Sequence, residues 1–256
     1  MGQNAGVLTA ILFGLAASSA LVIGAVIGSL WDPPREVTGV LLAFASGALI
    51  SALAFELFDE AYQLGGAVRS GLALLAGAAA FVIADTWLDR RVTGTSGPEQ
   101  SEVARTGAAK SAGGAQRTVG FALLAAVTLD GVPENLALGV SLVDDASLAL
   151  LVAIFASNLP EALVGAVAMR AGGQHVRTVV GTWLICAALL AAAVVAGRVL
   201  ADPMSDQTLS IALGFAGGAV LASLADTLMP EAFERGKPFT AFATAAGFFL
   251  SFMLAA

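Results

Sequence analysis

Residues 5–30 read AGVLTAILFGLAASSALVIGAVIGSL, a run without a single charged side chain. A helix needs about 20 mostly apolar residues to cross the roughly 30 Å hydrocarbon core of a bilayer. The run is longer than the roughly 7–15 apolar residues of a signal peptide, and no basic residue precedes it. We therefore expect it to be the first membrane span and to be kept in the mature protein.

The composition of the whole chain is typical of an integral membrane protein. Of its 256 residues, 58% are hydrophobic and 12% are charged, and the mean hydropathy is +0.87. Soluble domains have about 45–50% apolar and about 25% charged residues, so the apolar excess here has to face lipid. The net charge of −7 excludes a nucleic-acid-binding protein, and the single cysteine, Cys186, excludes a secreted disulfide scaffold.

The chain contains seven further stretches that are apolar enough to span a membrane, which predicts an all-α protein with eight transmembrane helices. The predicted spans are 5–30, 37–62, 66–89, 118–143, 146–169, 176–200, 207–232 and 238–256. Residues 90–117 are rich in Gly, Ser, Thr and charge, which predicts a flexible loop between the third and fourth spans. We expect the chain, 1–256, to form a single transmembrane domain.

The basic residues predict the orientation of this domain. With eight spans, one side of the membrane receives only Arg69 and Arg198. The other side receives Arg35, Arg90, Arg91, Arg105, Lys110, Arg117, Arg170, Arg177, Arg235 and Lys237. The side richer in Lys and Arg normally faces the cytosol, so we expect a cytosolic 90–117 loop and extracytoplasmic termini. We expect a multi-pass protein of the cell (inner) membrane of a prokaryote.

The acidic residues, unlike the basic ones, lie inside the apolar stretches. An ionisable side chain at mid-bilayer costs at least about 2.5–3.5 kcal/mol, so each is a candidate for function. They are Glu56, Asp59, Asp85, Asp130, Glu134, Glu161, Asp226 and Glu231. Because we expect no basic partner for them within the spans, they must be protonated, reach water or hold a cation.

Two segments of the chain repeat each other. Residues 44–61 (FASGALISALAFELFDEA) match residues 215–232 (FAGGAVLASLADTLMPEA), and Glu60 recurs as Glu231. A shorter match pairs Val132-Pro133-Glu134 with Leu159-Pro160-Glu161. The members of each pair run antiparallel in an eight-span chain, which predicts inverted repeats in a 3+2+3 arrangement with a substrate site near the midplane. Chance similarity among Ala- and Gly-rich helices is the alternative.

This repeat spreads the acids along the depth of the membrane. Glu56, Asp59 and Glu60 fall near the outer end of the second span. Asp226 and Glu231 fall near the inner end of the seventh. The acids of the fourth and fifth spans lie between them. The pattern predicts a cation pathway with carboxylates at the entrance, the centre and the exit.

The centre of this pathway is predicted around the two Pro-Glu pairs. Asp130 and Glu134 are four residues apart and share one helix face. Pro133 leaves the carbonyl of Leu129 without its helical donor, and Pro160 does the same for Ala156, beside Ser157, Asn158 and Glu161. These groups predict an all-oxygen metal site made by Asp130, Glu134, Glu161, Asn158 and Ser157. The alternative is that the prolines only kink the helices and the acids are protonated.

With these motifs, the sequence resembles the ZIP (Zrt/Irt-like) divalent-metal transporters over nearly its whole length. In that family the fourth span carries His-Asn-x-Pro-Glu-Gly and the fifth carries His/Gln-Asp/Glu-x-Pro-Glu. Glu134 and Glu161 match the two glutamates, whereas Asp130 stands in place of the histidine. Gly131 replaces the asparagine, and Ser157 and Asn158 replace the first two residues of the second motif. The resemblance implies alternating access by a mobile bundle that contains the fourth and fifth spans.

The departures from the family pattern change the metal that we expect. The only histidine, His175, falls in a predicted turn, Cys186 is predicted to be in the core, and residues 182–196 of the sixth span hold no acid or histidine. Without nitrogen and sulfur donors, the site favours harder cations such as manganese, magnesium or calcium, although zinc and iron(II) also accept carboxylates. One ion shared by Asp130, Glu134 and Glu161 is the expected arrangement.

The sequence thus predicts a transporter that moves a divalent cation of the zinc, iron or manganese class toward the cytosol, with the metal as substrate and no cofactor. The alternative is a degenerate, non-transporting relative that serves as a membrane scaffold or interaction protein. We do not expect an enzyme, because the spans contain no histidine, no Gly-x-Gly-Asp pattern and no His-Glu-x-x-His motif. We expect contacts with the lipid bilayer and none with nucleic acid, and the sequence leaves a homodimer open.

Overall fold

A computed structural model of the chain describes residues 2–92, 115–143 and 147–255. All of its regular structure in these ranges is helical. The α-helices are α1 (Gly2–Leu30), α2 (Arg35–Ala52), α3 (Asp59–Val92), α5 (Ala115–Ser141), α6 (Leu148–Ala171), α7 (Val176–Ala201), α8 (Asp206–Ser223), α9 (Met229–Gly236) and α10 (Thr240–Ala255). Two π-helical segments, η1 (Leu53–Phe58) and η2 (Leu224–Leu228), continue α2 and α8.

Five helical segments of the described chain are long and apolar enough to cross a membrane, which indicates a multi-pass membrane protein. They are Ala5–Leu30, Arg35–Leu88, Leu148–Ala171, Val176–Ala201 and Asp206–Gly236. A shorter apolar helix covers Thr240–Ala255. The second segment contains a sharp kink at Gly66, whose φ of 73° and ψ of 168° suit glycine, near the boundary between the predicted spans 37–62 and 66–89.

The predicted loop 90–117 is shorter than expected at both ends. Helix α3 continues to Val92 and α5 begins at Ala115, so residues 90–92 and 115–117 are helical. Helix propensity explains this difference, because Arg, Ala and Gln are good helix formers that prolong an existing helix despite their polarity. The rest of the predicted loop, residues 93–114, lies outside the described residues.

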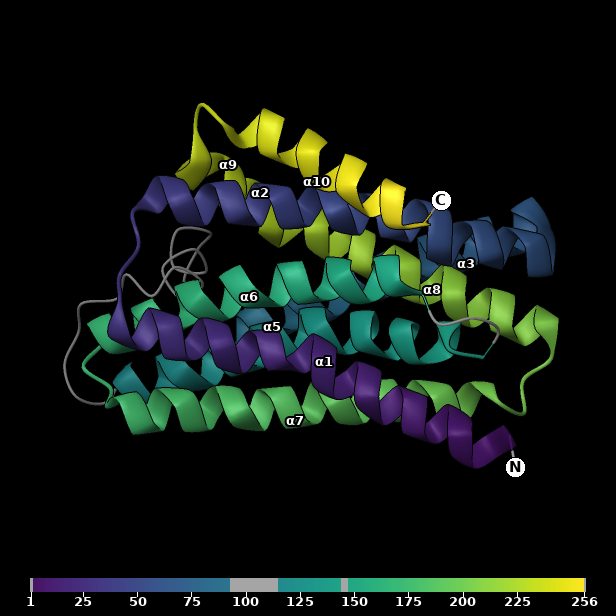
Figure 1. The fold of residues 1–256 in the computed structure, drawn as a ribbon, viewed down its shortest axis with the longest axis horizontal. Coiled ribbons are helices and arrows are strands. Elements are labelled where there is room, and N and C mark those ends of the chain that lie inside the picture. The colour runs from purple at the N-terminus through teal and green to yellow at the C-terminus, as the bar shows by residue number, and fades with distance from the viewer. Residues whose placement is uncertain (1, 93–114, 144–146, 256) are drawn as a thin grey trace.

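The helices form an elongated bundle in which most of them lie along the long axis (Figure 1). The connections 31–34, 172–175 and 237–239 lie at one end of this bundle. The N-terminus and the connection 202–205 lie at the opposite end. Consequently α2 and α8 begin at opposite ends and run in opposite directions.

Glycines allow the helices to approach one another closely. A Cβ atom on Gly28 of α1 would lie only 2.3 Å from the carbonyl oxygen of Leu163 in α6. A Cβ atom on Gly197 of α7 would lie 2.3 Å from the carbonyl oxygen of Leu136 in α5. Small residues at such crossings are typical of membrane helices, which have no hydrophobic drive to associate within lipid. Helices α5 and α6 are thus each packed tightly against a long apolar helix.

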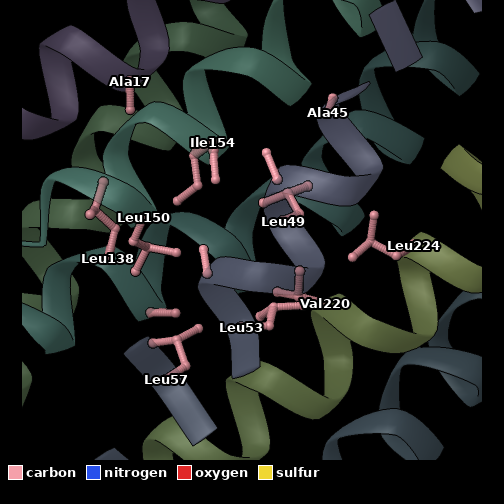
Figure 2. Close-up of a cluster of buried hydrophobic side chains, with 14 of the residues drawn as sticks. Ala17, Ala45, Leu49, Leu53, Leu57, Leu138, Leu150, Ile154, Val220 and Leu224 are labelled. Atoms are coloured by element: carbon pink, nitrogen blue, oxygen red, sulfur yellow. The ribbon is translucent and has the colours of Figure 1, made fainter. Parts of the chain in front are cut away.

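The largest buried cluster joins helices from both halves of the chain. Figure 2 shows Leu49 and Leu53 from α2 and η1 beside Val220 and Leu224 from α8 and η2. Leu138, Leu150 and Ile154 extend this cluster into α5 and α6. The core therefore holds the two halves of the chain around the helices that carry the Pro-Glu motifs.

Candidate metal site

The two Pro-Glu motifs lie within helices α5 and α6, which contact each other. Both helices continue through their prolines, Pro133 and Pro160. A proline inside a helix has no N–H to donate to the carbonyl four residues earlier. The carbonyl oxygens of Leu129 and Ala156, each four residues before a proline, therefore lack their helical donors.

Glu134 is the most enclosed of the predicted acids, with only 7% of its surface exposed. Ser157 of α6 is fully buried and lies close enough to the Glu134 carboxylate for its hydroxyl to stabilise that group. The Ser157 hydroxyl also lies 3.0 Å from the carbonyl oxygen of Ile154. Since a serine has one proton to donate, it can turn toward either acceptor and can release the carboxylate to a cation.

Three carboxyl groups lie within electrostatic range of Glu161 on α6. Glu134 and Asp130 act on it from α5, and Glu231 acts on it from α9. Asp130 also acts on Glu134, four residues along the same helix. The three acids predicted at the centre are thus within electrostatic range of one another, and Glu231, which the sequence had placed at the inner end of the pathway, is within range of Glu161.

The side chains of these acids are not arranged closely enough to hold a metal ion by themselves. Within the described ranges, no three His, Cys, Asp or Glu side chains lie close enough together to hold a metal ion. A cation bound here would need additional oxygens. The Ser157 hydroxyl and the carbonyls that the prolines leave without donors are the nearest candidates, and such oxygen donors suit hard divalent cations.

Asn158 is oriented by helix α1. Its side chain is 1% exposed, and its Nδ2 atom donates a long hydrogen bond of 3.4 Å to the carbonyl oxygen of Ala17. This bond anchors α6 to α1 at the turn before Glu161. The side-chain oxygen of Asn158 is thus the only part of the residue that could contribute to a cation site.

The acids predicted along the pathway differ in their surroundings. Glu56 in η1 is partly buried, whereas Asp59 and Asp226 are exposed. Asp59 accepts a hydrogen bond of 2.8 Å from Nε2 of Gln63. The segments η1 and η2, which carry Glu56 and Asp226, continue α2 and α8 without a break.

The prediction that the acids of the spans have no basic partner is wrong for Glu231. Its Oε1 atom lies 2.8 Å from Nη2 of Arg235. The helical run reaches Gly236, beyond the predicted end of the span at residue 232. Arg235 therefore stands one helical turn after Glu231 and on the same face, where an i, i+4 ion pair forms readily.

The side chains that were predicted to take no part in the site are placed as expected. His175 is exposed and precedes the first residue of α7, and Cys186 is fully buried. Gly131 faces α7, because a Cβ atom there would lie 2.7 Å from Cδ1 of Leu190. The contact gives a packing reason for a glycine at this position of the Pro-Glu motif.

One polar residue beside the site was not predicted to belong to it. Asn135 is fully buried, and its Nδ2 atom donates to the carbonyl oxygen of Gly131 at 2.8 Å while its Oδ1 atom has no hydrogen-bond partner. The signal was present in the sequence, because Asn135 directly follows a Pro-Glu pair. Glu60, predicted with the acids of the pathway entrance, has a buried carboxylate oxygen.

Comparison with known proteins adds no family to this picture. Neither a protein-family model nor a curated protein matches the chain.

Proposed function

We propose that this protein is a membrane transporter of divalent metal cations of the zinc, iron or manganese class, similar to the ZIP family. The transported ion enters from the extracytoplasmic side, binds between α5 and α6, and leaves toward the cytosol. Asp130, Glu134 and Glu161 supply the negative charge, and Ser157 and Asn158 supply neutral oxygens. The protein resides in the cell (inner) membrane of a prokaryote and is not an enzyme.

The observation that carries this proposal is the meeting of two Pro-Glu motifs inside apolar helices. Glu134 and Glu161 come from different helices and interact electrostatically with each other. Asp130 interacts electrostatically with both of them. Charged groups are costly in a membrane and are retained mainly along substrate or ion pathways. Their shared negative charge and the nearby carbonyls suit a divalent cation that has shed part of its hydration shell.

An eight-span topology is part of the proposal. The segment Arg35–Leu88 has 54 residues, and at 1.5 Å per residue it is about 80 Å long, which exceeds a single bilayer crossing. Its kink at Gly66 divides it into two crossings. Helix α5 and the shorter apolar α10 supply the remaining two crossings of the eight.

Close helix contacts support inverted repeats in a 3+2+3 arrangement. Gly28 approaches the carbonyl of Leu163 three residues after Pro160, and Gly197 approaches that of Leu136 three residues after Pro133. Gly47 and Gly218, which match in the sequence repeat, approach the carbonyls of Thr244 and Leu74 at the same distance, 1.9 Å from an ideal Cβ. The π-helical segments η1 and η2 also begin at matched positions, Leu53 and Leu224.

Uptake into proteoliposomes tests the proposal. We expect purified protein to carry at least one of Mn²⁺, Fe²⁺, Zn²⁺, Co²⁺ and Cd²⁺, with Mg²⁺ as a further competitor. We expect Glu134→Gln to reduce this uptake by at least about tenfold, because even groups behind metal ligands typically change affinity about 10–100-fold. The control is Glu36→Gln, which removes an exposed acid at the start of α2.

One observation favours a second candidate function, a non-transporting membrane scaffold. The described residues contain no cluster of three His, Cys, Asp or Glu side chains that could hold a metal. A scaffold predicts that wild type shows no uptake and no metal binding, and that Glu134→Gln and Glu161→Gln leave its behaviour unchanged. Uptake by wild type that is lost in both variants would exclude this candidate.

A further inference from the structure

The two copies of the sequence repeat differ at the position one turn after their last glutamate. Glu60 matches Glu231, and both residues have a buried carboxylate oxygen. The residue four positions later is Leu64 in the first copy and Arg235 in the second. The matching positions thus hold a cationic side chain in the second copy and a neutral side chain in the first.

Arg235 forms an ion pair with Glu231. The Nη2 and Oε1 atoms lie 2.8 Å apart, and the side chains of Arg235 and Glu231 are 19% and 29% exposed. The backbone that carries Arg235 packs on α2, since a Cβ atom on Gly39 would lie 2.1 Å from the backbone nitrogen of Gly236. The close approach of α9 to α2 thus limits how far Arg235 can move as a whole.

The other charged groups nearby do not replace Arg235. Lys237 lies 4.0 Å from the centre of the Phe233 ring, a cation–π contact that directs its ammonium group toward the ring. Glu234 is exposed and acts on Glu231 as a second negative charge. Arg235 is consequently the basic residue paired with Glu231.

The charge of Glu231 affects the central acids, because Glu231 interacts electrostatically with Glu161. If Glu231 carried an uncompensated negative charge, it would increase the attraction of the central site for a cation. It would also offer a cation leaving that site a second carboxylate to bind. Arg235 opposes both effects, because it already occupies the carboxylate with a positive charge that cannot be lost at neutral pH.

We infer that Arg235 is a tethered competing cation, which neutralises Glu231 and so weakens retention of the transported ion at the end of the bundle that holds α9. This inference rests on the proposed function and assigns Arg235 to its release step. In the first repeat the matching position holds Leu64, which carries no charge. The ion pair between Arg235 and Glu231 thus favours release of the transported cation from this end over its rebinding there.

Equilibrium binding and uptake of Mn²⁺ together test this role. Binding to purified protein is followed by the loss of the electron paramagnetic resonance signal of free Mn²⁺, and uptake is measured in proteoliposomes. We expect Arg235→Gln to tighten Mn²⁺ binding about two- to fivefold, the range of a partly exposed charge pair. We expect its KM and its maximal rate of uptake both to fall, since the ion is held longer.

Three further variants separate this role from a structural one. Arg235→Lys keeps the positive charge and should behave as wild type, and the double variant Glu231→Gln/Arg235→Gln should return binding and rate toward wild type. Arg198→Gln is the matched control, because Arg198 forms an i, i+4 pair with Asp202 at 2.9 Å with similar exposure. Asp202 belongs to the connection 202–205, at the end of the bundle opposite to the connection 237–239 that follows α9.

The outcomes are distinguishable. If Glu134→Gln abolishes uptake while Arg235→Gln leaves Mn²⁺ affinity and rate unchanged, the inference is wrong and the proposed function stands. The inference is equally wrong if Arg235→Lys behaves like Arg235→Gln, or if Arg198→Gln gives the same changes. If the wild type neither binds nor carries any of the cations, the proposed function fails and the inference fails with it.

Discussion

At the scale of single residues, the contact between Ser157 and Glu134 places a neutral hydrogen-bond donor beside one of the acids of the proposed cation site. Ser157 is fully buried and can donate either to Glu134 or to the carbonyl of Ile154. A hydroxyl with an alternative acceptor can stabilise the carboxylate while the site has no cation and turn away when a cation binds. A fixed basic residue at the same position would instead compete with the substrate.

The substitution Ser157→Ala tests this residue. We expect it to change the KM for the transported cation about two- to tenfold, because one hydrogen bond contributes about 0.5–1.5 kcal/mol. The matched control is Ser46→Ala, since Ser46 is equally buried but donates only along α2, to the carbonyl of Leu42 at 2.8 Å. If both variants change the KM alike, the effect comes from packing and not from the Glu134 contact.

At the scale of helices, the glycine contacts determine how closely α5 and α6 are held by their neighbours. Gly28 and Gly197 each meet a backbone carbonyl, which cannot turn aside as a flexible side chain can. A Cβ atom at either position would force the helices apart. The two contacts occupy matching positions relative to Pro160 and Pro133, so they secure both Pro-Glu helices in the same way.

Gly28→Ala and Gly197→Ala should therefore have similar effects. We expect each to lower the stability of the detergent-solubilised protein by about 1–3 kcal/mol, the usual cost of overpacking. The loss is measured as a lower midpoint of thermal unfolding followed by size-exclusion chromatography. Gly181→Ala is the control, because a Cβ atom there meets nothing within 4 Å. A clear difference between the first two variants would argue against equivalent repeats.

At the scale of the whole molecule, the arrangement of the connections gives the topology a direct test. Residues 172–175 and 202–205 lie at opposite ends of the bundle (Figure 1). The positive-inside rule assigns the end with 172–175 to the cytosol. In this orientation, the release step that we propose would take place at the end with α9 and Arg235.

Labelling of introduced cysteines with a membrane-impermeant maleimide measures this orientation. We expect Gln207→Cys to react in intact cells and His175→Cys to react only after the membrane is opened, since both positions are exposed and lie toward opposite ends. Cys186 is fully buried and should give little background. Labelling of His175→Cys from outside would reverse the proposed direction of transport.

The amino-acid sequence by itself determined the helical class and the membrane environment of this protein, along with the short list of acids. It did so because transfer free energies depend on local composition: long uncharged stretches are stable only in lipid, and acids within them are recognisable without coordinates. The kink at Gly66 was also predictable, because a Gly-Gly pair punctuates an apolar run. These properties are all set by residues close together in the chain.

Only the tertiary structure decided which of those acids meet and which groups accompany them. Three interactions join residues from different helices: Ser157 with Glu134, Asn158 with Ala17, and Glu231 with Glu161. Such contacts depend on how helices rotate and cross, which is set by glycine-to-carbonyl packing spread over the bundle. The pairing of Arg235 with Glu231 depended on where the last helical turn ends, and local composition does not fix that boundary.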